Sequence, residues 1–313
     1  MALIGVFKKE ELKGALCLRA VHFNLWVLPK TIRGVLSDAL CFRDFGFYRY
    51  FSDVGLRLEV RGAAVSEIEL HLPASTYVAQ SAFDLEAVVL DEDTNDLVFG
   101  RKVQSNNNAI SYTRRGIEIR DTVHGISTLC ATDSPNRFRI VLKSAITSTT
   151  EPATAYIRFR YPLPQKNELI SSIGWGFAKK GFTFDARLND FREVVEYRGK
   201  NETQTMMSGD EANIFIIHPA TYSITLQSPE PHYTRLLEPK VWGKYLRSCG
   251  LFKSDQKFII TQWSSSKFSH DEPFKVFAKL HKEFGMSVAL VYFVGILTVP
   301  VVNGLFGLIS KLF

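Results

Sequence analysis

The first half of the chain alternates apolar and polar positions with a period of two, the pattern of β-strands that have one wet face. The alternation is clearest in 56–60, 67–72, 116–121, 137–144 and 155–163. Two further apolar runs flank the polar stretch 91–96 and predict a hairpin over 83–103. Short strands with few helical stretches between them predict a β-sandwich or jelly-roll-like body.

Three stretches have helical patterns instead. Residues 28–42 and 238–250 predict short helices, the second ending at Gly250. Residues 271–284 begin with Asp271 and Glu272, acidic residues that favour a helix N-terminus. An apolar stripe that includes Phe274, Phe277 and Leu280 then predicts an amphipathic helix. Between them, 212–227 predicts two strands separated near residues 218–219.

These patterns divide the chain into four expected parts. Residues 1–163 form the β-sandwich-like domain, and the loop chemistry of 161–167 precedes a smaller α+β region over 164–250. Residues 251–283 form a basic juxtamembrane linker with the amphipathic helix. The last part is 284–313.

The last part is the strongest signal in the sequence. From Phe284 to Ser310 there are 27 residues without one Asp, Glu, Lys or Arg. A bilayer core needs about 20 apolar residues in a helix, and a buried core helix usually keeps a polar face. The run therefore predicts a transmembrane helix, so the protein is expected in a membrane with a single pass.

The charge distribution gives an orientation. Residues 240–283 contain nine basic and four acidic residues, whereas 1–150 contain 18 basic and 17 acidic residues. Basic residues near a span stay on the cytoplasmic side, so the body is expected to face the cytoplasm. Lys275, Lys279 and Lys282 are the expected contacts to anionic lipids; the alternative is an ordinary solvated helix face.

Four residues inside the predicted span are unusual for a simple anchor. Pro300 frees a backbone carbonyl, Asn303 seeks a hydrogen-bond partner, and Gly304 and Gly307 permit close approach of another helix. They favour association with a second copy or a partner protein. The alternative places Asn303 at the wet interface.

Candidate chemistry is sparse elsewhere. The seven histidines and four cysteines form no metal-binding motif, and no phosphate-binding loop or nucleophile elbow occurs, so no metal or cofactor is expected. His218, at the end of an apolar run, is the only weak catalytic candidate, with Asp185 and Asp190 as potential partners; a structural histidine is the alternative. The aromatic and basic stretch 42–51 is interpreted as core, which argues against direct nucleic-acid binding.

The layout leads to three hypotheses. In layout it resembles the membrane effectors of prokaryotic immune systems, which implies a sensing or partner-binding body and a span that inserts or oligomerises to alter membrane integrity. The alternative is a passive tail-anchored binding or scaffold module. The third is a membrane-tethered hydrolase using His218, so whether the protein is an enzyme stays open.

Overall fold

The computed structural model describes the chain in fifteen stretches. They are residues 2–12, 14–29, 48–72, 82–99, 102–114, 116–132, 136–164, 167, 169–173, 181–190, 204–238, 242–243, 245–246, 257–269 and 271–282.

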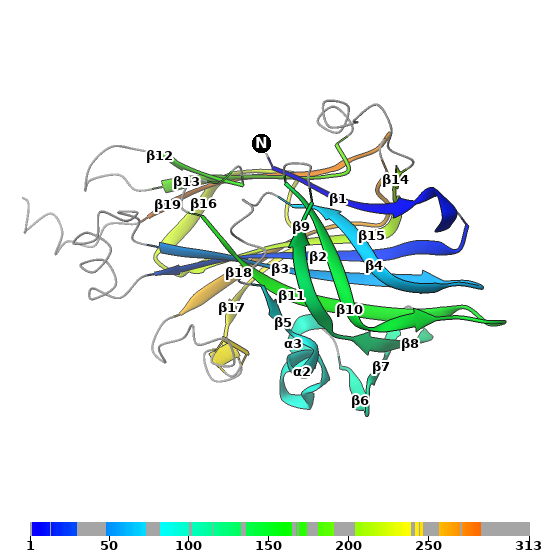
Figure 1. Cartoon of the computed structure of the whole chain (residues 1–313). Helices are drawn as coiled ribbons and strands as arrows, with labels where there is room; N and C mark the ends of the chain where they lie inside the picture. Colours follow the sequence, from blue (N-terminus) through cyan, green and yellow to red (C-terminus); the bar gives the residue numbers. More distant parts are fainter. Residues whose placement is uncertain are drawn as a thin grey trace, which may run out of the picture.

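Most of these residues are in strands, which confirms the mainly β fold class. They form two mixed sheets (Figure 1). The nine-stranded sheet has the order β16 (Tyr222–Ser228), β19 (Phe274–Lys282), β13 (Gly181–Leu188), β1 (Ala2–Lys9), β4 (Ala64–His71), β10 (Arg137–Thr147) and β9 (Ile126–Ala131), with β12 (Ile170–Ile173) beside β13 and β14 (Gln204–Met206) beside β1. The ten-stranded sheet has the order β17 (Tyr233–Leu237), β18 (Phe258–Ser265), β15 (Gly209–Pro219), β2 (Leu16–Pro29), β3 (Tyr48–Val60), β11 (Ala153–Leu163), β8 (Ile117–His124), β7 (Ala109–Arg114) and β6 (Gln104–Asn106), with β5 (Phe83–Asp84) beside β11.

The main core lies between the two sheets. Val6 and Phe184 from the nine-stranded sheet share one buried cluster with Phe23, Leu56 and Ile157 from the ten-stranded sheet. Every second residue of these strands points into this layer, because side chains alternate across a strand. The arrangement is therefore sandwich-like, as the period-two pattern predicted.

A second apolar cluster covers part of the other face of the ten-stranded sheet, which we call its outer face. Here Trp26 and Tyr156 pack with Val98 and Phe99 of α3 (Glu92–Phe99) and with Tyr245. Helix α2 (Glu86–Leu90) adds Val89 to this cluster. Elsewhere in the chain, a 3-10 turn, Glu10–Leu12, follows β1. Figure 1 shows α2 and α3 side by side next to β5. Both faces of the central strands are therefore buried over part of their length.

The two sheets draw strands from both sides of the expected domain boundary after Leu163. β1 pairs in parallel with β13, and β2 pairs in parallel with β15. The boundary thus falls inside both sheets. The described residues of the α+β region expected over 164–250 are mainly in strands. Of the five described residues of the helix expected at 238–250, four are helical, and the two strands expected over 212–227 are β15 and β16.

Two local predictions were wrong. The hairpin expected over 83–103 is instead the two-residue strand β5 followed by α2 and α3. The amphipathic helix expected over 271–284 is the strand β19, which is hydrogen-bonded between β13 and β16. In β19, Phe274, Val276, Ala278 and Leu280 are buried and the residues between them are half-buried, so the period is two.

None of the helices among the described residues has the length and apolar character needed to cross a bilayer. The segment expected to do so, 284–313, lies outside the described residues, as do residues 30–42 of the helix expected at 28–42; residues 28 and 29 belong to β2.

Candidate functional site

A cavity of about 530 Å³ lies on the outer face of the ten-stranded sheet. Its floor comes from four adjacent strands, β18, β15, β2 and β3. Val98 and Phe99 of α3 and residues 112–114 of β7 contribute to the lining, as do His232 and Tyr233 at the start of the edge strand β17. Volumes of about 300–1,000 Å³ are typical of small-molecule sites, so the cavity is large enough for a ligand.

A chain of oriented polar groups crosses the floor. Gln262 Nε2 donates to Asn213 Oδ1 at 2.7 Å, and Asn213 Nδ2 donates to Glu211 Oε1 at 2.9 Å. Arg114 forms an ion pair with the other carboxylate oxygen of Glu211 at 2.5 Å. Because a carboxylate only accepts hydrogen bonds, Glu211 determines which way the amide of Asn213 points, and Asn213 in turn orients Gln262.

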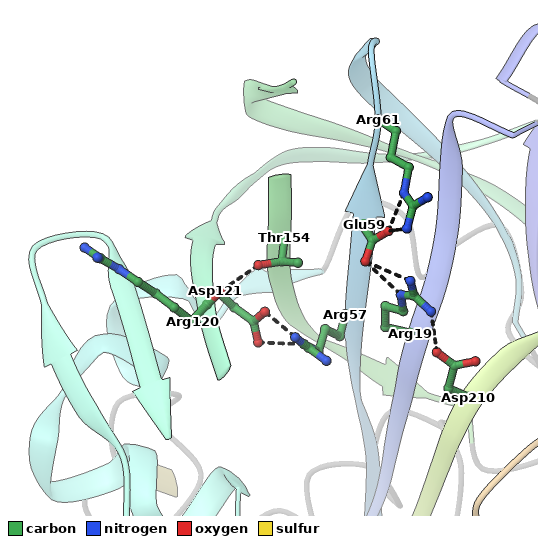
Figure 2. Close-up of polar contacts among 8 residues, drawn as sticks. All are labelled: Arg19, Arg57, Glu59, Arg61, Arg120, Asp121, Thr154 and Asp210. Carbon is green, nitrogen blue, oxygen red and sulfur yellow. Dashed lines mark hydrogen bonds and ion pairs between the residues drawn. The ribbon is translucent and has the colours of Figure 1, made fainter. Parts of the chain in front are cut away.

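The second arginine of the cavity is also paired. Arg57 Nε lies 2.8 Å from both carboxylate oxygens of Asp121, a residue with no exposed surface. Figure 2 shows Arg57 of β3 beside Asp121 of β8, with Arg120 directed away from the pair; in the sheet order β11 lies between these two strands. Each arginine that lines the cavity is thus matched by a carboxylate, so these four groups together are neutral.

A separate ion-pair group lies farther along β2 and β3 (Figure 2). Glu59 accepts from Arg19 at 2.8 Å and from Arg61 at 2.6 Å, and Arg19 also pairs with Asp210 at 2.7 Å. Burial opposes the charge of Glu59, but its hydrogen bonds with Arg19 and Arg61 outweigh burial and lower its pKa. Asp210 and Arg61 are well exposed, so this group is screened by solvent and contributes modestly to stability.

Aromatic side chains connect the cavity to the interior. Phe99 stacks on Tyr112 with ring centroids 5.3 Å apart, and its ring is 4.8 Å from that of Tyr156. His22, which lines the cavity, has its Nδ1 3.1 Å from the hydroxyl oxygen of Tyr156. Tyr156 also accepts a hydrogen bond from Arg158 at 3.0 Å. One wall of the cavity is therefore continuous with a buried polar network.

Asp53 is the centre of that network. Its Oδ2 accepts from Trp26 at 2.7 Å, from Tyr245 at 2.8 Å and from Arg160 at 2.8 Å. Arg158 Nε donates to the Tyr245 hydroxyl at 3.1 Å. Burial opposes the charge of Asp53, yet Arg160 and Arg158 outweigh burial and lower the pKa of this carboxyl group. Two arginines and one aspartate, all at most 1% exposed, are thus held in one buried cluster.

The lysines expected to contact lipid lie on β19. Lys275 pairs with Asp190 at 3.1 Å, and Arg187 contacts the same carboxylate at 3.2 Å. Lys279 lies four positions further along, and Lys282 is the last residue of the strand. The three lysines therefore lie along an extended strand of the nine-stranded sheet, whereas an amphipathic helix was expected over 271–284.

His218 lies in the interior of the ten-stranded sheet and outside the cavity lining. It has no exposed surface, and its Nδ1 is 3.0 Å from the carbonyl oxygen of Pro219. Burial lowers its pKa. Asp185 and Asp190 pair with Arg187 in the other sheet, so the structure does not bring the three expected residues together.

The remaining predicted site residues, Pro300, Asn303, Gly304 and Gly307, lie outside the described residues. The motif 42–51 is described from Tyr48 onward, and Tyr50 and Phe51 are buried, as the core interpretation expects. No three His, Cys, Asp or Glu side chains come together to hold a metal ion within the described part of the chain.

No residue of the cavity was predicted as a site residue from the sequence. Its members are distributed between Ala20 and Ser266, and their proximity depends on the parallel pairing of β15 with β2. The only local signal was polar residues at alternating positions in otherwise apolar strands, such as Asn213 beside Ile214.

Comparison with known proteins assigns no family. No protein-family model and no curated protein sequence matches the chain. Among solved structures, an M1 zinc metallopeptidase from Deinococcus radiodurans matches with a TM-score of 0.34 and 11% identity over 84% of this chain and 42% of the other. A variant of a two-domain M1 zinc metallopeptidase bound to L-arginine matches with a TM-score of 0.34 and 10% identity, over 85% and 42%. The chain thus spans less than half the length of these structures, and a likeness this weak transfers neither fold nor activity.

Proposed function

We propose that this protein is a membrane-acting effector. Its β-sandwich body binds a ligand or partner in the cytosol, and its segment 284–310 inserts or oligomerises in the bilayer and alters membrane integrity. The observation that carries the proposal is the 27-residue run without a charge, which begins two positions after the last residue of β19. A role in prokaryotic immunity is part of the same proposal and rests on the resemblance in layout, a body followed by an uncharged C-terminal segment, to the membrane effectors of prokaryotic immune systems.

The short connection supports coupling between body and span. β19 is hydrogen-bonded on both sides, to β13 and to β16, so the strand that ends at Lys282 is held within the nine-stranded sheet. Only Glu283 separates Lys282 from Phe284. A span attached this way experiences a change in the body directly, whereas a long flexible linker would absorb it.

The strand distinguishes Lys279 from Lys275 as candidates for lipid contact. Strand residues rise about 3.3 Å each, so Lys279 is roughly 10 Å and Lys275 roughly 23 Å from the strand end. Lys275 also pairs with Asp190, which is only 3% exposed. Of these two lysines, Lys279 is therefore the stronger candidate for an anionic headgroup in this proposal.

The test compares three forms of the chain in cells. They are the full chain, a chain that ends at Glu283, and a full-length form in which 286–309 is replaced by leucines. The chain ending at Glu283 keeps all of β19, so it should fold; a chain ending at Pro273 lacks that strand and serves as a misfolding control. Carbonate-resistant membrane association and dye-reported membrane potential are measured, with and without co-expressed genomic neighbours.

An effector gives depolarisation with the native segment and none with the leucine segment, although both resist carbonate. If both forms resist carbonate and neither changes the potential, with or without the neighbours, the segment is a passive anchor and the body is a tethered binding module. The hydrolase hypothesis gains no support, because His218 is buried beside the carbonyl oxygen of Pro219, and Asp185 and Asp190 pair with Arg187 in the other sheet.

A further inference from the structure

We propose that the cavity on the outer face of the ten-stranded sheet binds a neutral saccharide. This inference goes beyond the membrane activity and does not depend on segment 284–310. It rests on the balance of charge, the orientation of the polar groups and the aromatic rings on the walls.

The charge balance argues against an anionic ligand. Arg57 is held by both oxygens of the buried Asp121, and Arg114 is held by Glu211. A phosphate site needs guanidinium groups that can turn their donors toward the ligand. Here each guanidinium already has a carboxylate at hydrogen-bond distance, so the cavity offers polarity without an excess of positive charge.

The polar floor suits a ligand with many hydroxyl groups. A sugar hydroxyl donates and accepts at once, so it needs donors and acceptors placed close together. The relay from Gln262 through Asn213 to Glu211 presents oriented amides beside a carboxylate. In Gln262 the relay uses Nε2, and the carbonyl oxygen Oε1 takes no part in that bond. Ser264 and Ser266 add hydroxyl groups to the lining, whereas the hydroxyl of Ser265 donates to the carbonyl oxygen of Lys267 at 2.6 Å.

Aromatic rings flank this polar floor. Tyr233 lines one side, with the Arg235 guanidinium 5.8 Å from its ring centroid, and Phe99 and Tyr112 stack on the other. The C–H face of a pyranose ring is apolar and packs on an aromatic ring, while its hydroxyls point outward to polar groups. Pockets with apolar walls and a few placed polar groups are typical of small-molecule sites.

The experiment uses the purified full chain in a detergent without a sugar head group. Saturation-transfer NMR is recorded with glucose, galactose, N-acetylglucosamine, maltose and cellobiose, and separately with adenosine and inorganic phosphate. We expect transfer to at least one neutral saccharide, with a dissociation constant of the order of a millimolar or tighter. We also expect no transfer to adenosine and no displacement of the saccharide by phosphate.

Two variants test the location. Gln262→Leu removes the amide and Tyr233→Ala removes the ring, and each should weaken saccharide binding by about tenfold or more. Leu236→Ala is the matched control, because Leu236 is 54% exposed on the same edge strand but does not line the cavity. Tyr233→Phe keeps the aromatic ring and should retain most of the saccharide binding. Retained binding in Tyr233→Phe would attribute the loss in Tyr233→Ala to the missing ring.

The proposal is overturned if none of the saccharides binds, if only adenosine or phosphate binds, or if saccharide binding is the same in both cavity variants as in the unaltered chain. None of these outcomes bears on membrane depolarisation, so the two proposals fail separately.

Discussion

A Cβ atom built on Gly55 would lie 2.3 Å from the hydroxyl oxygen of Tyr156. The two residues lie on the neighbouring strands β3 and β11, where Gly55 is directly opposite Arg158. The phenol of Tyr156 leans across Gly55 and thereby reaches His22 in the cavity wall. The missing side chain of Gly55 thus permits the connection between cavity and buried network.

Gly55→Ala should therefore destabilise the protein by about 1–3 kcal/mol, the usual cost of overpacking a filled interior. Tyr156 is 1% exposed and cannot move aside into solvent. The free energy of unfolding, measured by urea denaturation, tests this.

The double variant Gly55→Ala with Tyr156→Phe is its control. Removal of the hydroxyl relieves the 2.3 Å contact, although the ring carbon at 3.0 Å stays close. The alanine should cost less in the phenylalanine background than in the unaltered chain. An equal cost in both backgrounds would show that the Tyr156 hydroxyl does not limit this position.

Asp53→Asn should be more damaging. The carboxylate accepts hydrogen bonds from Arg160, Trp26 and Tyr245 in a fully buried setting. Loss of its charge leaves Arg158 and Arg160 with less compensation, and removing one partner of a buried ion pair costs about 3–5 kcal/mol.

Tyr245→Phe is the comparison for Asp53→Asn. It removes one hydroxyl from the same network without changing any charge, so its cost should be near 1 kcal/mol. Urea denaturation gives the loss in the free energy of unfolding for each variant, and the two losses are then compared. Equal costs would mean that the charge of Asp53 adds nothing beyond hydrogen bonding.

The sequence predicted several strands of the sandwich, among them β4, β8, β10, β11, β15 and β16, but not β1, β2, β13 or β18. Its main error has a physical explanation. In β19, Phe277 is apolar but lies at an outward position, so Phe274, Phe277 and Leu280 imitate a helical stripe. The alternation of Val276, Ala278 and Leu280 carried the correct period. Pairing with β13 and β16 decides for the strand, and this long-range pairing has no local signature.

The cavity could not be predicted at all. Gln262, Asn213 and His22 meet because β18, β15 and β2 are neighbours, although the chain brings them from three distant places. Each appears in the sequence as a single polar residue in a strand, which usually means a wet face. Only the covering by α3 and β7 turns that face into a cavity, and the residues of α3 were predicted as the turn and the start of the second strand of a hairpin.

Stability should fall in mild acid because of His71. Burial, helped by the nearby Arg137, lowers the pKa of this histidine to about 4, below its ordinary value of 6.5. Above pH 6.5 the ring is neutral in both the folded and the unfolded chain, so His71 does not lower the free energy of unfolding there. Between pH 6.5 and about 4 the unfolded chain binds a proton that the folded chain does not, so the free energy of unfolding decreases by up to about 3 kcal/mol.

His71→Gln isolates this contribution, because carboxylates also titrate in acid. Urea denaturation of the variant and the unaltered chain at several values between pH 7.5 and 4 gives the difference in stability. That difference should shift in favour of the variant as the pH decreases and then level off near pH 4. A difference that stays constant with pH would mean that His71 keeps an ordinary pKa in the fold.

Replacing Lys275 and Lys279 by alanine, one at a time, should have different effects on stability and on lipid binding. Lys275 pairs with Asp190, a residue only 3% exposed, so Lys275→Ala should lower stability by about 1 kcal/mol and leave lipid binding nearly unchanged. Lys279 lies nearer the strand end, and Lys279→Ala should weaken binding to anionic vesicles about fivefold, as expected for the loss of one cation near the surface.

The measurement uses the chain ending at Glu283, so that insertion of the segment does not mask the electrostatic contribution. Sedimentation with vesicles of phosphatidylcholine and phosphatidylserine gives the affinity, and vesicles of phosphatidylcholine alone give the background. Added salt should weaken binding of the unaltered chain more than that of Lys279→Ala, because an exposed charge is screened. If the two variants lose affinity equally, the ion pair with Asp190 does not withdraw Lys275 from the membrane surface, and the whole face of β19 contacts lipid.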